Sequence, residues 1–311
     1  MELGKRGIFF TLTAIALLSL ALISFSILSI SKQRHSISKR VETLNSFVHS
    51  LEEDMKRKLY ISGFRIIFLF EKRIVRSGAY ISDAENASRE AFFQGTIDGS
   101  ADNDEQVLLD GVKFSDIKND VLSLGRKLNL EVSLENPSLE VYQKNPWFVH
   151  LKLTTNFSAR DINGLASWNK TLITEADVPV IGFEDPLYVL NTNGKVFQKI
   201  NRTPYKPLVS GSDVTNLTNH VNGGFYIASN KSPSFLNRLE GNFSWNDFGI
   251  ESLVNIPLLS SLGIEVYDKS VVDSVYFSNS NPTSHNIQGM PPWFKIDDDH
   301  LEIYNLTGLT T

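Results

Sequence analysis

The residues best suited to metal chemistry lie near the carboxyl end, where His300 follows the three consecutive aspartates Asp297–Asp299. Imidazole nitrogens and carboxylate oxygens are common ligands for transition metals and hard cations. Three consecutive side chains of a strand point to alternating faces, however, so they cannot converge on one ion. We therefore predict a solvent-exposed turn. The other histidines form no H-x-x-x-H or H-E pairing. They are His35, His49, His150, His220 and His285.

A second group of possible ligands lies in the sequence DGSADND, residues 98–104, which places side-chain oxygen atoms at alternate positions. An EF-hand loop also needs glycine at its sixth position and glutamate at its twelfth. This loop has neither residue at those positions. An EF-hand is therefore excluded, and only a looser calcium site is left open.

Catalytic residues are hard to identify in this chain. Cleavage of a glycosidic bond needs two carboxylates at a set separation. Glu184 and Asp185 are adjacent and directly precede Pro186, and we interpret them as part of a turn. The chain has no cysteine, and no G-x-S-x-G, P-loop, G-x-G-x-x-G or kinase motif. We expect no catalytic residue, no cofactor site and no metal site.

Asn-X-Ser/Thr sequons are the clearest candidate modification sites. The sequence contains eight of them, none with proline in the middle position, and all follow the apolar amino-terminal segment. In an exported domain each is a possible acceptor for N-glycosylation. The predicted glycosylation sites are Asn86, Asn156, Asn169, Asn201, Asn216, Asn230, Asn242 and Asn305.

The overall composition excludes further classes of protein. The chain has 311 residues, of which 41% are hydrophobic, and this is typical of a chain that folds. Its formal net charge of −5 and the lack of a basic cluster in the later chain argue against a nucleic-acid partner. Without cysteine there are no disulfides and no thiolate sites, so the core and the secondary structure must provide the stability.

The amino-terminal segment is apolar enough to enter a membrane. Residues Ile8–Ile30 carry no charge and include neither proline nor glycine. A helix of this length spans about 30 Å, the thickness of the hydrocarbon core of a bilayer. Signal peptides have apolar cores of only about 7–15 residues. We therefore predict a retained membrane helix, with lipid as its partner, while Ser29–Ser31 leaves cleavage open.

Two opposing signals bear on the orientation of this helix. Lys5 and Arg6 precede it, but more basic residues follow it, within residues 32–40. The positive-inside rule would then place the carboxyl side in the cytoplasm. The sequons favour the opposite orientation, and large domains translocate largely regardless of flanking charge. We predict a single-pass protein of the cell membrane with an extracellular carboxyl-terminal part.

A helical stem is expected directly after the membrane segment. Apolar residues recur at spacings of four and three, and charged residues fill the positions between them. A helix with such a stripe must bury it against the protein's own globular part or against another copy. The helix is expected to end at Gly78. The residues of the stripe are Ile37, Val41, Leu44, Val48, Leu51 and Met55.

The remaining chain predicts an α+β fold. Helical spacing returns in residues 112–128, and from residue 130 the apolar period changes to two, which predicts an antiparallel meander of about four strands. Residues 181–311 read as a mixed, strand-rich region, with strands near 263–280 and 293–306 and a short helix capped by Ser232 and ended by Gly241. The expected parts are residues 1–31, 32–77, 78–180 and 181–311.

The beginning of the chain is similar to one family. The sequence KRG followed by IFF and a long apolar helix resembles archaeal type IV pilin-like surface proteins with a class III signal peptide. The resemblance covers mainly residues 1–77 and implies cleavage after Gly7, which would leave Ile8 as the new amino terminus. Leu12 stands where the family usually has glutamate. This difference favours a minor or pseudopilin-like role over that of a major filament subunit.

These observations lead to two functional hypotheses. The first is a surface-exposed pilin-like, adhesion or envelope protein without catalytic activity, which associates with itself or with other pilin-like subunits through its amino-terminal helix. Its ligand would be a surface glycan or protein. The alternative is a membrane-anchored ectodomain that binds or cleaves glycans, with tryptophans that stack on sugars. We expect those tryptophans, Trp168, Trp245 and Trp293, to pack in the core or along strands instead.

Overall fold

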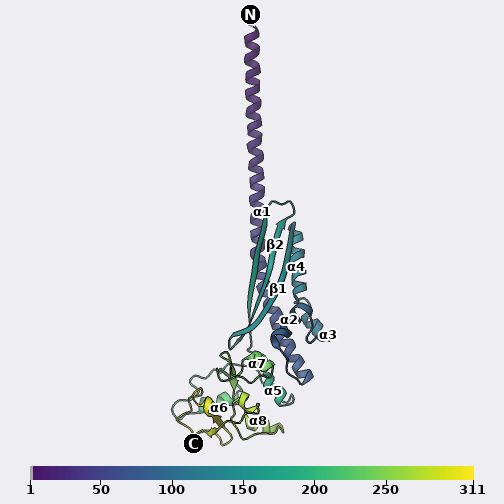
Figure 1. Ribbon diagram of the computed structural model, residues 1–311. Coiled ribbons are helices and arrows are strands. Elements are labelled where there is room, and N and C mark those ends of the chain that lie inside the picture. The colour runs from purple at the N-terminus through teal and green to yellow at the C-terminus, as the bar shows by residue number, and fades with distance from the viewer. Residues whose placement is uncertain (1–2) are drawn as a thin grey trace. The chain divides into compact units, whose positions relative to one another are not determined.

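The computed structural model has the predicted α+β fold: a long amino-terminal helix, an antiparallel three-stranded meander and a region of short helices and strands (Figure 1). The structure describes the backbone of residues 3–311 and the side chains from residue 9 onward. At the predicted processing site, Gly7–Ile8, the Ile8 side chain therefore lies outside the described residues. The chain forms two compact units, which we describe separately. Unit 1 comprises residues 1–54, 119–136 and 155–172, and unit 2 comprises residues 55–118, 137–154 and 173–311.

The predicted membrane segment and stem are one continuous helix, α1 (Leu3–Ser77). It contains no proline. After residue 7 its one internal glycine is Gly63, which packs closely against the Leu151 side chain: a Cβ atom at this position would lie only 2.7 Å from it. Gly78 ends the helix as predicted, because it adopts a φ of 65° and donates its N–H to the Ile74 carbonyl at 2.9 Å. A left-handed residue at this position satisfies a carbonyl that would otherwise lack a partner.

Unit 1 buries the stripe of α1 within its own fold. Leu44, Val48 and Leu51 are buried, together with Phe47, whose ring lies 6.5 Å from that of Phe157. The first part of the predicted stripe is not buried in this way, since Ile37 is half-buried and Val41 is exposed. Arg40 pairs with the buried Asp161, with 3.1 Å between Nε and Oδ1. The stripe is thus covered by the chain itself from Leu44 onward.

The sheet has three strands where about four were predicted. They are β1 (Leu130–Asn145), β2 (Phe148–Asp161) and β3 (Ser167–Pro179), in the order β1-β2-β3. The sequence Asn136–Pro137 is typical of a turn, but β1 continues through it. Asn136 has a φ of 50°, and the buried positions of β1 change from even to odd numbers across it. One left-handed residue changes the face that the side chains occupy without ending the strand, as in a bulge.

Three further helices follow α1 along the chain: α2 (Ala84–Gln94), α3 (Asn103–Leu109) and α4 (Phe114–Lys127). The last confirms the helical spacing predicted there. The polar loop at residues 98–104 was not expected to begin a helix, yet α3 starts inside it. Asp102 accepts a hydrogen bond from the Glu105 N–H at 2.9 Å, and Glu105 accepts one from the Asp102 N–H at 3.1 Å. This reciprocal capping box explains why the polar sequence starts a helix.

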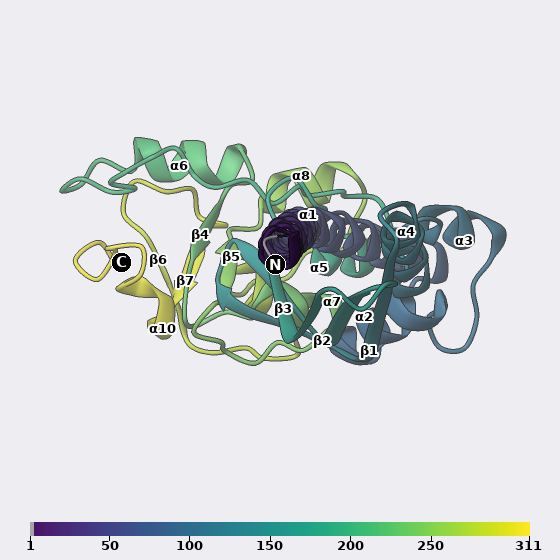
Figure 2. The same cartoon turned by 90° about the horizontal axis from the view of Figure 1, so that it is seen from above.

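The carboxyl-terminal region, residues 181–311 within unit 2, consists of short elements joined by loops (Figure 2). The region mixes helices and strands as predicted, but its strands are short: β4 pairs with β5 and β6 with β7, each strand having three residues. The helices are α5 (Pro186–Asn191), α6 (Thr215–Asn222), α7 (Phe235–Leu239), α8 (Ile256–Ser261), α9 (Asp273–Tyr276) and α10 (Asp298–Leu301). The strands are β4 (Tyr226–Ala228), β5 (Ile250–Ser252), β6 (Ser284–Asn286) and β7 (Lys295–Asp297).

The predicted short helix is present as α7, although its cap differs. Ser234 rather than Ser232 is the N-cap and accepts a hydrogen bond from the Asn237 N–H. Ser232 is buried and donates its hydroxyl hydrogen to Glu251 Oε2 at 2.6 Å instead. Gly241 follows the helix with a φ of 67°, as expected of a residue that stops it.

Candidate functional site

The apolar part of α1 is the most exposed hydrophobic surface of the described chain. Large side chains from Phe9 to Ile30 are between 51% and 73% exposed. The most apolar 18-residue window of this helix has a mean hydropathy of 2.3, and none of it is buried. By length and composition, α1 can cross a membrane as an anchor or enter one as a signal sequence. Its surface can contact lipid or other subunits.

The predicted glycosylation sites lie largely at the surface. Seven of the eight sequon asparagines are exposed, and Asn216 is half-buried. Asn216 donates its Nδ2–H to the Pro207 carbonyl at 2.9 Å, and Asn86 donates to Asp83 Oδ2 at 2.6 Å. A transferase would have to break these two hydrogen bonds before it could modify the amides. Exposure is thus compatible with modification, and use of the sequons stays a prediction.

The exposed turn predicted at Asp297–His300 is wrong, because Asp297 and His300 are buried. Helix α10 begins after Asp297, so these two side chains share one side, while Asp298 and Asp299 are exposed. His300 Nδ1 lies 2.6 Å from Asp297 Oδ1, and its Nε2 lies 3.4 Å from Glu251 Oε2. Burial alone would lower the pKa of His300, but the hydrogen bonds and charges of these two carboxylates outweigh it and raise the pKa to about 10.

The remaining histidines are dispersed. His150 Nδ1 lies 2.6 Å from Asp177 Oδ1, and His285 Nε2 lies 2.7 Å from Asp298 Oδ1. His220 is buried, and neither of its ring nitrogens has a hydrogen-bond partner among the described residues. Within the described part of the chain, no group of three or more His, Asp or Glu residues is arranged to hold a metal ion.

Arginines occupy the neighbourhood of the possible calcium loop. Arg76 pairs with Asp102 and lies 3.6 Å from Asp104, and Arg73 lies 3.9 Å from Asp98. Each of these carboxylates therefore already has a cationic neighbour. A calcium ion would have to displace guanidinium groups, so the loop is poorly suited to hold one.

Asp185 is not part of a simple exposed turn but belongs to a buried ion-pair network. It caps α5, and its Oδ2 accepts hydrogen bonds from Arg238 Nη1 at 2.6 Å and from the Tyr226 hydroxyl at 2.8 Å. Arg238 also makes a bidentate pair with Asp273, at 3.0 Å for each nitrogen, and donates to the Ile250 carbonyl. Burial and the charge of Asp273 raise the pKa of Asp185 although Arg238 lowers it. All three charged side chains are inaccessible to solvent, and the network joins the starts of α5 and α9 to α7.

Two of the three highlighted tryptophans lie at the surface. The expectation was packing in the core or along strands, and Trp168 lies on strand β3, whereas Trp245 lies in neither. Trp168 is 39% exposed and Trp245 is 54% exposed, whereas Trp293 packs against the carboxyl-terminal core. The Lys231 ammonium lies 3.9 Å from the centroid of the Trp245 ring. One face of that ring is therefore covered by a cation.

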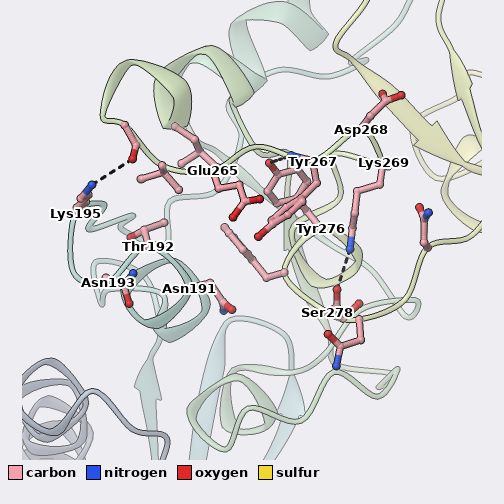
Figure 3. Close-up of a pocket in the computed structure, with 16 residues that line it drawn as sticks. Asn191, Thr192, Asn193, Lys195, Glu265, Tyr267, Asp268, Lys269, Tyr276 and Ser278 are labelled. Carbon is pink, nitrogen blue, oxygen red and sulfur yellow. Dashed lines mark hydrogen bonds between the residues drawn. The ribbon is translucent and has the colours of Figure 1, made fainter.

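A pocket of about 700 Å³ lies in the carboxyl-terminal region (Figure 3). Loops after α5 and α8 form it, together with the end of α9 and the chain that follows. The sequence pattern did not indicate this pocket, because its lining comes from segments without a period and is rich in asparagine. The lining residues are Asn191, Thr192, Asn193, Lys195, Leu259, Gly263, Ile264, Glu265, Tyr267, Asp268, Lys269, Tyr276, Phe277, Ser278, Asn279 and Asn281.

The two lysines of the pocket hold its walls. Lys195 donates from Nζ to the Leu262 carbonyl at 3.2 Å, and Lys269 donates to the carbonyls of Ser278 and Ser280 at 2.8 and 2.9 Å. Burial lowers the pKa of Lys269. Figure 3 shows, on opposite sides of the pocket, the Lys269 bond to the Ser278 carbonyl and a second Lys195 bond, to the Gly263 carbonyl at 3.4 Å. Because their N–H donors bind backbone carbonyls, the lysines help to fix the shape of the pocket, and they keep their positive charge.

Comparison with known proteins adds no family to these observations. No family model, no curated protein and no solved structure matches this chain.

Proposed function

We propose that this chain is a single-span surface protein without catalytic activity, anchored by α1 and pilin-like in its amino-terminal organisation. In this proposal it serves in a filament, in adhesion or in an envelope contact. The main support is that the exposed apolar segment Phe9–Ile30 continues without a break into a helix whose next apolar face is buried. A membrane helix built into a folded unit in this way is better suited to permanent anchoring than to removal.

One part of the stem is not available for assembly with another copy. The chain's own residues cover the stripe from Leu44 onward, so that part is not free to form a coiled coil with a neighbour. Association would therefore use the apolar surface between Phe9 and Ile30. Leu12 keeps this surface uncharged where the family usually has glutamate. Packing in lipid would then rest on van der Waals contacts and on small or polar residues such as Thr13 and Ser19.

The processing and orientation of the chain can be tested on the full protein in its native host. We expect amino-terminal sequencing to find Ile8 as the first residue and the protein to remain in the membrane fraction. A chain that begins at Met1 would remove the pilin-like proposal and leave a plain anchor. A chain that begins beyond residue 31 would remove the anchor as well.

Orientation can be measured by labelling introduced thiols, because the native chain has no cysteine. Ser260 is exposed on α8, so a Ser260→Cys variant should react with a membrane-impermeant maleimide in intact cells. A Lys32→Cys variant, at the outer end of the predicted span, serves as a second exported position. Labelling only after lysis would show that the carboxyl-terminal part is cytoplasmic and would contradict the proposal.

Self-association can be examined with the same tool. A thiol at Ala16 lies within the apolar segment and should give crosslinked oligomers if copies pack through this helix. A Ser50→Cys variant, exposed on the stem outside the membrane segment, is the matched control. Equal crosslinking of both variants would indicate random collision rather than assembly through the membrane segment.

A further inference from the structure

The pocket in the carboxyl-terminal region has a lining that selects among ligand classes. Its lysines are bound to backbone carbonyls, and Asp268 is paired with Lys295 at 2.6 Å between Oδ1 and Nζ. Figure 3 shows Asp268 directed away from the pocket and Glu265 directed toward its middle. Lys195 and Lys269 keep their positive charges when they bind carbonyls, so among the described residues the lining holds two ammonium groups and one unpaired carboxylate, Glu265. This nearly balanced set gives no strong preference for a highly charged ligand.

A metal ion and an apolar ligand fit this lining no better. One available carboxylate is too few for a calcium site, which takes six to eight oxygen ligands. Among the described residues, no side-chain hydrogen bond engages Asn193, Asn279, Asn281 or Glu265. An apolar ligand would leave these polar groups without partners when it displaced water.

The free polar groups match hydroxyl groups in their hydrogen-bonding capacity. Each amide carries two N–H donors and a carbonyl acceptor, and Glu265 adds acceptors only. A hydroxyl both donates and accepts, so several closely spaced hydroxyls can satisfy amides and a carboxylate together. Asn193 comes from the loop after α5, and Asn279 and Asn281 come from the chain after α9. The groups thus surround the pocket rather than lie on one wall.

An aromatic surface accompanies these groups. Tyr267 is 50% exposed, and its ring lies 6.0 Å from that of Tyr276 at an interplanar angle of 54°. The Tyr267 N–H donates to the Tyr276 hydroxyl at 3.0 Å, which fixes the two residues relative to each other. An aromatic ring with one face exposed to solvent provides an apolar surface for the C–H groups on one face of a sugar ring. Unlike Trp245, Tyr267 has no cation over its ring among the described residues.

We propose that this pocket binds a neutral saccharide, with its ring against Tyr267 and its hydroxyls hydrogen-bonded to the asparagine amides and Glu265. A volume of about 700 Å³ lies within the range of small-ligand pockets, roughly 300–1,000 Å³, and accommodates two or three sugar rings. Binding at this site does not depend on membrane anchoring or on processing after Gly7. The proposal can therefore fail while the surface-protein proposal stands, and the reverse also holds.

The test uses the full chain in a detergent without a sugar headgroup, titrated by calorimetry with maltotriose, mannotriose and N,N′,N″-triacetylchitotriose. We expect at least one of these neutral trisaccharides to bind. Tyr267→Ala should weaken that binding by about tenfold, since it removes the stacking surface. Tyr267→Phe keeps the ring and should stay within about twofold of the native affinity. Trp245→Ala removes an equally exposed aromatic side chain outside the pocket and should change nothing.

Two further variants keep the test decisive if Tyr267→Ala disturbs folding, which circular dichroism would show. Asn281→Ala and Glu265→Gln change exposed positions, and each should weaken binding severalfold, since the first removes an amide and the second replaces a charged acceptor. The proposal is overturned if none of the trisaccharides binds, or if Trp245→Ala weakens binding as much as Tyr267→Ala. Tight binding of trigalacturonate or trilysine in place of the neutral sugars would also overturn it, in favour of an anionic or a peptide partner respectively.

Discussion

Unit 1 and the carboxyl-terminal region place their charged residues very differently. In unit 1, one long helix buries an apolar face around Leu44 and Leu51, and the partly exposed Arg40 pairs with the buried Asp161. In the carboxyl-terminal region, the longest of the described helices has eight residues, and Arg238 lies with two aspartates out of contact with solvent. A long periodic element can be stabilised by apolar burial alone. Short elements joined by loops leave many polar groups that need hydrogen-bond partners. In this region a buried charged side chain that binds several partners joins the short elements to one another.

The largest expected effect would come from removing the centre of that network. Arg238→Met leaves Asp185 and Asp273 buried without their cation, which should lower the free energy of unfolding by about 3–5 kcal/mol. Urea denaturation of the full chain in detergent would measure it. Lys231→Met removes a partly exposed cation of the same region and should cost less than about 1 kcal/mol. If both variants lost equally little, the network would not be what stabilises this region.

A slightly smaller loss in the free energy of unfolding is expected in unit 1, where the variant removes only apolar contacts. Leu51→Ala removes a buried side chain and leaves a cavity, which should cost about 3 kcal/mol. Val41→Ala, on the exposed part of the same helix, should cost less than about 1 kcal/mol. The two variants can be compared by the same denaturation. Equal losses would mean that the stripe is not covered as described.

The third effect depends on pH and is expected in the carboxyl-terminal region, at His220. Burial lowers the pKa of His220 to about 4, an effect that Glu251 only partly opposes, and the nearest aromatic ring is that of Tyr304 at 6.2 Å. The unfolded chain binds this proton near pH 6.5, so the folded state loses stability as the pH falls from about 6.5 to about 4. The loss from this group should reach about 3 kcal/mol at pH 4 and vanish above pH 7.

Replacing the imidazole tests this assignment. His220→Phe should remove that part of the acid dependence while leaving a comparable stability near pH 8, as measured by denaturation at a series of pH values. His285→Phe changes a partly exposed histidine and serves as the control. An unchanged slope between pH 6.5 and pH 4 in the His220 variant would show that other groups cause the acid sensitivity.

The smallest effect is expected at the Arg40–Asp161 ion pair of unit 1. Arg40→Gln removes the ion pair to Asp161 and a hydrogen bond to the Leu128 carbonyl, yet Asp161 Oδ2 still accepts from the Asn163 N–H at 3.0 Å. We expect the free energy of unfolding to fall by about 2 kcal/mol, because the buried Asp161 loses its cation but keeps this backbone hydrogen bond. Lys39→Gln changes an exposed neighbour and should have no measurable effect. A loss as large as that of Arg238→Met would remove the contrast between the two regions.

Periodic segments were predictable from the sequence because their burial follows a fixed spacing. The continuous helix, its end at Gly78, α4 and the change to strands near residue 130 all rest on such patterns. The carboxyl-terminal region was not predictable in this way, because segments such as those around Asp185 and Arg238, 53 residues apart, are joined by side-chain contacts with no period. The same reason hid the pocket at Tyr267, and it made Asp297–His300 look like a solvated turn.

The lack of a break in α1 has a mechanical consequence for unit 1. A helix turns by about 100° with each residue, so the buried position of Leu44 also fixes the direction in which each side chain between Phe9 and Ile30 points. The orientation of the membrane segment about the helix axis is therefore fixed relative to the folded part of unit 1. Inserting a single alanine after Ser36 would keep every contact of the folded part, yet it would turn the membrane segment to present a different side to its neighbours.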